Sequence, residues 1–450
     1  MRIFTRERSF YKTFFPLLIV ITLQQLASLA VNMVDNLMLG TYTELALSGA
    51  TIVNQIQHML QMLISGIAAG VAVLGAQYWG KGEIDPIRRI TAIGLKMALG
   101  AGVLFFGATQ LFPFGVLRLF TSDENVIAEG IKYLRLMCWT YLIFSVSNTL
   151  MYSLQSVETA FIGTLMSVST IIINACLNYL FIYGNLGMPE LGITGAAVAT
   201  LTSRVIELVI ITVYILFIDK KLRMKLRHLV SFDLSFFKDF VKISMPLVIS
   251  GGLWGVAQAA QMAILGHIDA TVIAANSIAS IIFAICSVIG IASANAASVT
   301  IGKTIGSGRL DLVRPYSRTM QAIFVLIGLF SGALLFIFKD MIADLYRVSE
   351  ETRKLAVNFM IILSITTVGT CYEYPTASGI IAGGGDTKYP AIVENTFMWL
   401  FIIPSAALSA FVFHFPPIVT FCFLKVDQIL KCIPNAIRCN RYKWVRELTR

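Results

Sequence analysis

The sequence predicts an all-α polytopic membrane protein, with twelve transmembrane helices in two pseudo-symmetric six-helix lobes. Only 13% of the 450 residues are charged and the mean hydropathy is +0.77, whereas a soluble chain carries roughly 25% charged residues. Apolar windows of about 20 residues recur along the whole chain, which is the length that a helix needs to cross a bilayer, whereas barrel strands alternate over about 10 residues. A sparse pattern repeats after 226 positions, which predicts the two lobes.

The apolar windows fall into twelve spans, each long enough for one membrane helix. In chain order the predicted spans are 14–39, 46–79, 90–113, 131–154, 160–184, 192–218, 241–267, 272–303, 318–340, 353–382, 390–412 and 415–434.

Lysine and arginine gather in short loops after alternate spans and in the tail from Lys431 to Arg450. By the positive-inside rule, these loops and both chain ends lie in the cytoplasm. We therefore expect a multi-pass protein of the cell membrane whose apolar surface faces the lipid bilayer. The net charge of +10 is spread over these loops rather than gathered on one face, which argues against nucleic-acid binding.

The polar stretch 219–239 nearly bisects the chain. It predicts a cytoplasmic linker between an N-terminal lobe, 1–218, and a C-terminal lobe, 240–450, which ends in a short basic cytoplasmic tail. A shift of 226 positions (306 − 80) carries the pattern G-x-G-x-x-D-x-x-R from Gly80 onto Gly306. Because each lobe holds an even number of spans, the two lobes have the same orientation in the membrane.

Signals for an enzyme are missing from the sequence. The seven cysteines are scattered, without Cys-x-x-Cys or histidine spacing, so we expect no disulfide framework and no metal other than Na⁺ at the acid described next. The stretch AGGGDTK (382–388) lacks the spacing of a phosphate loop and predicts a tight cytoplasmic turn. With no nucleotide site, cofactor motif or catalytic cluster, we expect neither catalysis nor an ATP-driven pump.

Asp35 is the main candidate for a functional residue. It lies late in an otherwise uncharged apolar run that begins near Phe14, and an ionisable group at that depth costs about 3 kcal/mol. A carboxylate there takes a proton or binds Na⁺; the alternative is a side chain that snorkels to the outer headgroups. Asn174 and Asn178, spaced i, i+4, share one face of the fifth span. Their amide carbonyls suit a hard cation, or equally hydrogen bonds between helices.

Other charged residues also lie inside spans. Arg204 and Glu207 are three residues apart in the sixth span, and we interpret them as a structural ion pair because an unpaired charge there would be far costlier. Glu373, shortly before Pro375 in the tenth span, is interpreted as the only carboxylate well inside the second lobe. It is the candidate there for a second titrating group or for a partner of a cationic substrate.

Polar side chains form stripes on several spans, and such stripes face a protein interior or a water-filled cavity rather than lipid. With methionine and aromatic neighbours, they predict an adaptable pocket for bulky amphipathic solutes. Packing between helices is an equal alternative for any single residue. The candidate cavity residues are Gln57, His58, Gln61, Tyr141, Asn148, Trp254, Gln258 and Gln261.

Five segments together resemble one transporter family: VDNLMLG (34–40), QYWGKG (77–82), LGMPELGITGAAVATLTSR (186–204), GGGDTK (383–388) and KWVRELTR (443–450). In their order and spacing, the chain resembles the multidrug and toxic compound extrusion (MATE) family. That family belongs to the multidrug/oligosaccharidyl-lipid/polysaccharide flippase superfamily. The resemblance implies two six-helix lobes and export of small amphipathic organic cations, driven by Na⁺ or H⁺ entry. It implies no cofactor, and we expect a monomer.

The resemblance also implies a cation site in the N-terminal lobe. The family combines an acid on the first helix, an Asn-x-x-x-Asp pair on the fifth and a threonine on the sixth. Asp35, Asn174 and Thr200 match these positions, while Asn178 stands where the family has the aspartate, which shifts weight towards a proton. In the alternative, a lipid-linked oligosaccharide or polysaccharide precursor flippase, several arginine or lysine residues would line the cavity. The predicted spans show essentially only Arg204 and Lys96, which counts against this alternative.

Overall fold

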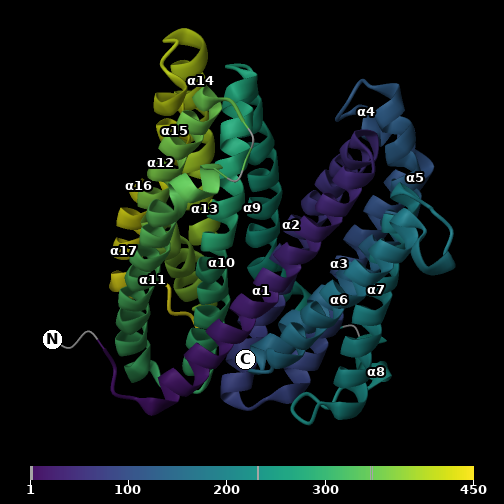
Figure 1. The fold of residues 1–450 in the computed structure, drawn as a ribbon. Helices are drawn as coiled ribbons and strands as arrows, with labels where there is room; N and C mark the ends of the chain where they lie inside the picture. Colours follow the sequence, from purple (N-terminus) through teal and green to yellow (C-terminus); the bar gives the residue numbers. More distant parts are fainter. Residues whose placement is uncertain (1–3, 231–232, 345, 347, 450) are drawn as a thin grey trace. The chain divides into compact units, whose positions relative to one another are not determined.

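The computed structural model describes residues 4–230, 233–344, 346 and 348–449, and it is built almost entirely from helices (Figure 1). Helices hold 87% of the residues, and no strand occurs in the described ranges. Within those ranges, ten helices are long and apolar enough to cross a membrane. The predicted all-α membrane fold is therefore confirmed.

The first six predicted spans all correspond to long helices, which extend beyond most of the predicted edges. They are α1 (Arg8–Tyr42), α2 (Glu44–Lys81), α3 (Ile84–Leu111), α5 (Glu124–Ser156), α6 (Phe161–Tyr183) and α7 (Ile193–Val213). Shorter elements connect them, namely α4 (Pro113–Arg118), the 3₁₀ turn η1 (Asn185–Gly187), the π-helical turn η2 (Tyr214–Ile218) and, in the predicted linker, α8 (Leu226–Val230).

The next five spans are also helical. They correspond to α9 (Leu234–Gly266), α10 (Ala270–Gly306), α11 (Leu310–Asp344), α12 (Glu350–Tyr374) with the π-helical turn η3 (Pro375–Ile381), and the series α13 (Lys388–Thr396), η4 (Phe397–Ile402), α14 (Ile403–Ala407) and η5 (Leu408–Val412).

The twelfth span differs from its prediction. The expected single helix over 415–434 is three short helices, α15 (Pro417–Lys425), α16 (Asp427–Leu430) and α17 (Cys432–Arg441), which continue past the predicted end. The interruptions fall at Val426 and Lys431, and both of these residues keep right-handed helical dihedral angles. The series therefore forms one interrupted rod rather than three separate turns.

Sequence signals explain where several helices begin. Asp123, Asp269 and Ser349 each precede a helix in an extended conformation, and each side chain accepts a hydrogen bond from a backbone N–H of the first turn. These bonds satisfy donors that have no partner inside the helix. Pro375 has no N–H to continue the hydrogen bonds of α12, and the π-helical η3 begins at that residue.

The helices group into two compact units. The C-terminal unit holds the chain up to Thr22, Ala76–Gly82 and everything from Ile249 onward; the N-terminal unit holds Leu23–Gly75 and Glu83–Val248. The helices α1, α2 and α9 therefore contribute to both units. The predicted lobe boundaries on either side of the linker stay a prediction.

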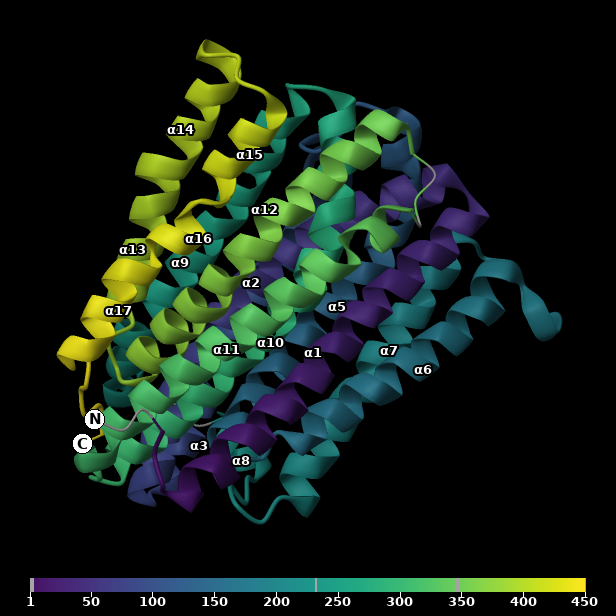
Figure 2. The ribbon, with the colours of Figure 1, turned by 60° about the vertical axis from the view of Figure 1, so that its left-hand side comes forward.

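Within the N-terminal unit, α5 packs on both α3 and α7, and α6 packs on α7 (Figures 1 and 2). Small residues allow close crossings in this unit. A Cβ atom on Gly94 would lie 2.4 Å from Val71 Cγ2, and one on Gly66 would lie 2.7 Å from Val248 Cα. The candidate residues of α1, α6 and α7 thus belong to one tightly packed body.

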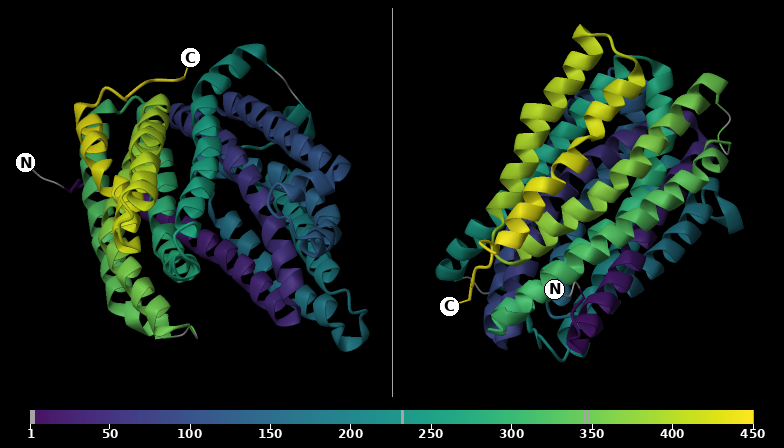
Figure 3. Two further views of the ribbon diagram at one scale, coloured as in Figure 1. Left: turned by 90° about the horizontal axis from the view of Figure 1, so that it is seen from above. Right: turned by 90° about the vertical axis from the view of Figure 1, so that its left-hand side faces the viewer.

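Within the C-terminal unit, α10, α11 and α12 pack on one another, and the rod α15–α17 runs along α12 (Figures 2 and 3). The repeated glycines meet in this unit. A Cβ on Gly80 would lie 2.1 Å from Lys303 O, and a Cβ on Gly306 would lie 1.8 Å from Gln77 O. Because the same shift of 226 relates both pairs, the contact between α2 and α10 is reciprocal, and each half of it requires a glycine.

Candidate functional site

The four residues of the predicted cation site lie together in the N-terminal unit. Asn178 Nδ2 donates to Asp35 Oδ1 at 2.5 Å and to Asn174 Oδ1 at 3.1 Å, and Asn174 Nδ2 donates to Thr200 Oγ1 at 3.3 Å. This chain of hydrogen bonds joins α1, α6 and α7, and all four residues are buried. Asp35 is only 6% exposed, so its side chain does not reach out of the bundle.

The charge of Asp35 has no direct counter-ion among the described residues. The Arg204 guanidinium attracts it from α7, but Arg204 Nη1 is bound to Glu207 Oε2 at 2.7 Å, the pairing expected from their spacing. Tyr133 of α5, which the sequence did not single out, is buried beside Asp35 and Thr200. The site therefore presents one carboxylate to a monovalent cation.

Asn178 has unused hydrogen-bonding capacity. Its Nδ2 makes both of the bonds described above, whereas its Oδ1 is buried and accepts no hydrogen bond. A buried acceptor without a partner costs about 1–3 kcal/mol. An amide in this position is suited to a second state, in which its oxygen faces a proton or a metal ion on Asp35.

The eight predicted cavity residues divide between the two units. Tyr141 and Asn148 of α5 keep a buried hydroxyl and a buried amide nitrogen without hydrogen-bond partners. Gln261 of α9 donates to Met398 Sδ at 3.2 Å inside its own unit. The role of this set as a cavity lining stays a prediction. Gln57, His58, Gln61, Tyr141 and Asn148 belong to the N-terminal unit, and Trp254, Gln258 and Gln261 to the C-terminal unit.

Glu373 is buried in the C-terminal unit beside a lysine. Lys431 Nζ lies 2.7 Å from Glu394 Oε2, 2.9 Å from Asp427 Oδ2 and 3.5 Å from Glu373 Oε1. Asn435 Nδ2 lies 3.4 Å from Glu373 Oε2. The four charged side chains come from α12, α13, α16 and the interruption between α16 and α17. We call Lys431, Glu373, Glu394, Asp427 and Asn435 the Lys431 cluster.

This cluster corrects two interpretations. Glu373 is not the only carboxylate inside the C-terminal half, because Asp427 is 4% exposed and the side chain of Glu394 is 26% exposed. Lys431 belongs to the core rather than to a solvated tail, since it is 3% exposed. Glu394 and Asp427 both lie inside predicted spans, at 390–412 and 415–434. Their position inside these spans is a sequence signal for further buried carboxylates in this half.

The basic tail also packs against the protein. Trp444 is fully buried. Arg446 N donates to Gly384 O at 2.9 Å, and Gln77 binds the tail on both sides, donating to Arg446 O at 3.1 Å and accepting from Leu448 N at 2.8 Å. Within the C-terminal unit, the tail therefore joins the end of α2 to the glycine-rich turn before α13.

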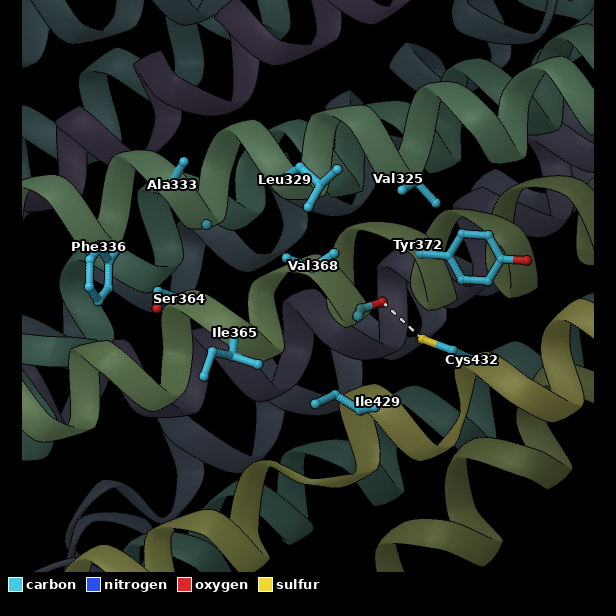
Figure 4. Close-up of a pocket in the computed structure, with 12 residues that line it drawn as sticks. Val325, Leu329, Ala333, Phe336, Ser364, Ile365, Val368, Tyr372, Ile429 and Cys432 are labelled. Carbon is cyan, nitrogen blue, oxygen red and sulfur yellow. Dashed lines mark hydrogen bonds between the residues drawn. The ribbon is translucent and has the colours of Figure 1, made fainter. Parts of the chain in front are cut away.

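A groove of about 760 Å³ opens between α11, α12 and the rod α15–α17 (Figure 4). Its lining is almost entirely apolar, with Leu329, Phe336 and Ile365 among its side chains. Figure 4 shows Cys432 Sγ directed at the backbone oxygen of Gly369, at 3.6 Å. No residue of the predicted cation site lines this groove. Among the described residues, no group of three histidine, cysteine or acidic side chains is arranged to hold a metal ion.

Comparison with known protein families identifies the family of this chain. The MatE family profile matches residues 21–180 and 246–408, which is more than half of the chain. The chain belongs to the MATE family of transporters. The two matched segments begin 225 positions apart (246 − 21), within one position of the internal repeat. The first of them contains Asp35, Asn174 and Asn178.

Relatives and solved structures extend this result. The chain is 25% identical to a probable multidrug resistance protein NorM of Streptococcus pneumoniae strain R6, covering 89% of this chain and 87% of the relative. It is 27% identical to a NorM protein of Rhizobium meliloti, covering 87% and 84%. The Vibrio cholerae MATE transporter VcmN in its bent form aligns with a TM-score of 0.84 at 17% identity over 98% of both chains.

A further solved structure bears on how far the fold predicts the function. A transporter of the same superfamily from Pyrococcus furiosus aligns with a TM-score of 0.87 at 18% identity, covering 96% of this chain and 95% of that one; its description suggests a different function from the reversed polarity of its binding pocket. Likeness at this identity shows the fold alone. The cargo must therefore be argued from the residues of this chain.

Proposed function

We propose that the chain is a secondary antiporter of the cell membrane that exports small amphipathic organic cations in exchange for H⁺ or Na⁺. The observation that carries the proposal is the buried hydrogen-bonded chain of Asp35, Asn178, Asn174 and Thr200. The multidrug resistance proteins to which the chain is similar support drugs as the cargo. Lysine and arginine in alternate loops support cytoplasmic termini, and we propose a monomer as the working unit.

In this proposal, the coupling ion binds at Asp35. A single buried carboxylate is neutralised by one monovalent cation, and an unneutralised charge in such an environment is costly. Rotation of the Asn178 amide would exchange its N–H for its unpartnered Oδ1. The N–H suits the ionised carboxylate, whereas the oxygen suits a carboxylic acid O–H or a bound Na⁺. The same four residues therefore fit both the loaded and the empty state.

Exchange requires that the loaded and empty sites favour different arrangements of the protein. Because a ligand shifts an equilibrium only by its differential affinity for two states, the cation and the drug must stabilise opposite arrangements. Asp35 lies on α1, a helix that contributes to both compact units. In our proposal, loading of Asp35 changes the packing of α1 against α6 and α7 and lowers the affinity for drug.

The composition of the site favours a proton over Na⁺. Asp35 is the only carboxylate among the four residues, and Asn178 supplies an amide where the family resemblance implies a second acid. A proton requires one carboxylate and one acceptor, while Na⁺ requires several oxygen ligands. The flippase alternative gains no support from the buried Lys431, since three carboxylates surround its ammonium and leave no positive charge for an anionic headgroup.

Efflux of a fluorescent organic cation from proteoliposomes, under separately imposed pH and Na⁺ gradients, tests this proposal. We expect efflux that follows the pH gradient and is lost in Asp35→Asn, which keeps the shape and the hydrogen-bonding partners of the site. Glu44→Gln, at the exposed start of α2, is the matched control and should transport normally. Full gradient-driven efflux by Asp35→Asn would discard the assignment of the coupling site.

A further inference from the structure

The groove between α11, α12 and the rod α15–α17 lies at membrane depth, since α11 and α12 are both long and apolar enough to cross a bilayer (Figure 4). Leu329, Phe336 and Ile365 line the groove with large apolar side chains that are at least half exposed. Exposed apolar surface of this kind on a membrane-spanning helix marks contact with lipid or with another apolar partner. An occupant of the groove therefore comes from the bilayer rather than from water.

Small residues form the floor of the groove. A Cβ atom on Gly332 would collide with the backbone oxygen of Ser364, and one on Gly369 would collide with the backbone oxygen of Gln428. At these two points α11 touches α12, and α12 touches the rod, with no side chain between the backbones. These crossings close the groove from behind, so it is a furrow that opens toward lipid rather than a passage into the protein.

The lining of the groove suits hydrocarbon rather than an organic cation. Its twelve lining residues, all in the described part of the chain, include no charged side chain. Ser364 Oγ and Cys432 Sγ donate to backbone oxygens three and four residues earlier, at 2.7 Å and 3.2 Å. Tyr372 Oη donates to Gln321 Oε1 at 2.8 Å. Because these polar side chains are already paired, the groove offers apolar contact and little else.

The length of the groove matches one acyl chain of one leaflet. Figure 4 shows Tyr372 and Cys432 beside Val325 at one end, and Ser364 beside Phe336 at the other. Along α11 the groove spans 11 residues (336 − 325), or about 16 Å at 1.5 Å per residue. One leaflet contributes about half of the hydrocarbon core of roughly 30 Å.

The two ends of the groove differ in charge. At one end, the hydrogen bond from Tyr372 to Gln321 joins α12 to α11 and stops a hydrocarbon chain. At the other end, Lys339 follows Phe336 by one helical turn, and its Nζ lies 4.4 Å from the centre of the Phe336 ring. The same nitrogen lies 3.0 Å from Oδ2 of Asp340, whose side chain is exposed. This end, the charged end, presents one ammonium and one carboxylate.

We propose that the groove binds one acyl chain of a zwitterionic phospholipid with an ethanolamine headgroup. The lipid phosphate lies at the Lys339 ammonium and the ethanolamine ammonium at the Asp340 carboxylate, so each charge of the headgroup meets its opposite. An anionic headgroup would face Asp340 with a like charge, which disfavours that lipid. With the cytoplasmic termini proposed above, the charged end lies toward the outer leaflet. Neither the binding nor its test depends on antiport.

Native mass spectrometry of the full-length protein in detergent, titrated with phosphatidylethanolamine, tests the groove. Ala333 is an exposed lining residue of α11, so Ala333→Phe fills the groove from its open side. We expect this variant to bind one lipid fewer than the wild type. Ala108→Phe, at an exposed position of α3, is the matched control and should bind as many lipids as the wild type. An Ala333→Phe variant that binds as many lipids as the control would overturn the proposal.

Two variants at the charged end test the headgroup contacts. Lys339→Gln removes the partner of the phosphate and should raise the Kd for phosphatidylethanolamine about fivefold, the upper range for an exposed ion pair. Asp340→Asn should weaken the binding of phosphatidylethanolamine but not that of phosphatidylglycerol, which has no ammonium. Wild-type protein that binds phosphatidylglycerol as tightly as phosphatidylethanolamine would overturn the proposed headgroup.

Photocrosslinking locates the acyl chain without any variant. Phosphatidylethanolamine with a diazirine in its acyl chain is irradiated with the wild-type protein in phosphatidylglycerol vesicles, and the labelled peptides are identified by mass spectrometry. We expect labels within 325–336 and 364–372 that are lost when unlabelled phosphatidylethanolamine is in excess. Labels spread evenly over the membrane helices would show adventitious lipid contact only and would contradict the proposal. Because no transport is measured, a failure of the antiport assignment would leave this result unchanged.

Discussion

Adding one methyl group at Gly306 tests whether the two halves of the repeat meet as the structure has them. A Cβ there would lie 1.8 Å from the backbone oxygen of Gln77, whereas ordinary van der Waals contact begins at 3.4 Å. The ends of α2 and α10 must therefore separate by about 1.6 Å (3.4 − 1.8). The obstacle is backbone rather than a flexible side chain, so overpacking costs of about 1–3 kcal/mol or more apply.

The helical preference of alanine acts in the opposite direction. Replacing glycine by alanine within a helix gains about 1 kcal/mol, so a matched control is needed. Gly255 in α9 has no atom within 4 Å of an added Cβ, and Gly255→Ala should be neutral or slightly stabilising. Gly306→Ala should lower the Tm by a few degrees in detergent, measured by tryptophan fluorescence at a fixed heating rate.

The reciprocal contact predicts a coupling between two variants. Gly80→Ala places its Cβ 2.1 Å from Lys303 O and should also destabilise the protein. Because either change already separates the ends of α2 and α10, the double variant should lose less than the two single losses combined. Gly306→Ala as stable as Gly255→Ala, or strictly additive losses, would refute the close reciprocal crossing.

Three further variants address other parts of the structure. Asn178→Asp adds the second acid at the Asp35 site and should make efflux respond to a Na⁺ gradient; an unchanged ion dependence in the proteoliposome assay would contradict the proposed ligand set. Glu207→Gln leaves the partly buried Arg204 without its partner and should cost about 1–3 kcal/mol, and the double variant with Arg204→Met should recover part of the lost Tm. Trp444→Ala removes a fully buried side chain and should cost about 3–5 kcal/mol, with cleavage of the tail by added protease as a second readout; a tail equally resistant in both proteins would argue against its packing.

Much of the fold follows from composition, because apolar runs of membrane length leave few alternatives to helices. Local spacing also predicted particular contacts. The i, i+4 asparagines, Asn174 and Asn178, share one face and bind each other, and the i, i+3 residues Arg204 and Glu207 pair directly. That Asp35 meets these asparagines required the family resemblance, since no spacing within one helix places α1 beside α6.

The Lys431 cluster could not be predicted from the sequence. Its members are brought together by packing between α12, α13 and the rod α15–α17, which is a long-range property of the fold. Because several basic residues follow Lys431, the sequence pattern places Lys431 in a cytoplasmic tail. Its buried position depends on three carboxylates, of which only Asp427 is close in sequence. The interruption of the last predicted span at Lys431, in contrast, has a signal in the sequence, because Pro434 has no N–H to bond to Leu430 O.

The central claim, that a cation on Asp35 and an exported drug exclude each other, is tested most directly by equilibrium binding in detergent. The Kd of a fluorescent organic cation should be measured at several pH values, with and without Na⁺, for the wild-type protein and for Asp35→Asn. The account predicts that drug binding to the wild type weakens as the pH falls, and that this dependence largely disappears in Asp35→Asn. An Asp35→Asn variant whose drug affinity changes with pH as steeply as that of the wild type would contradict it.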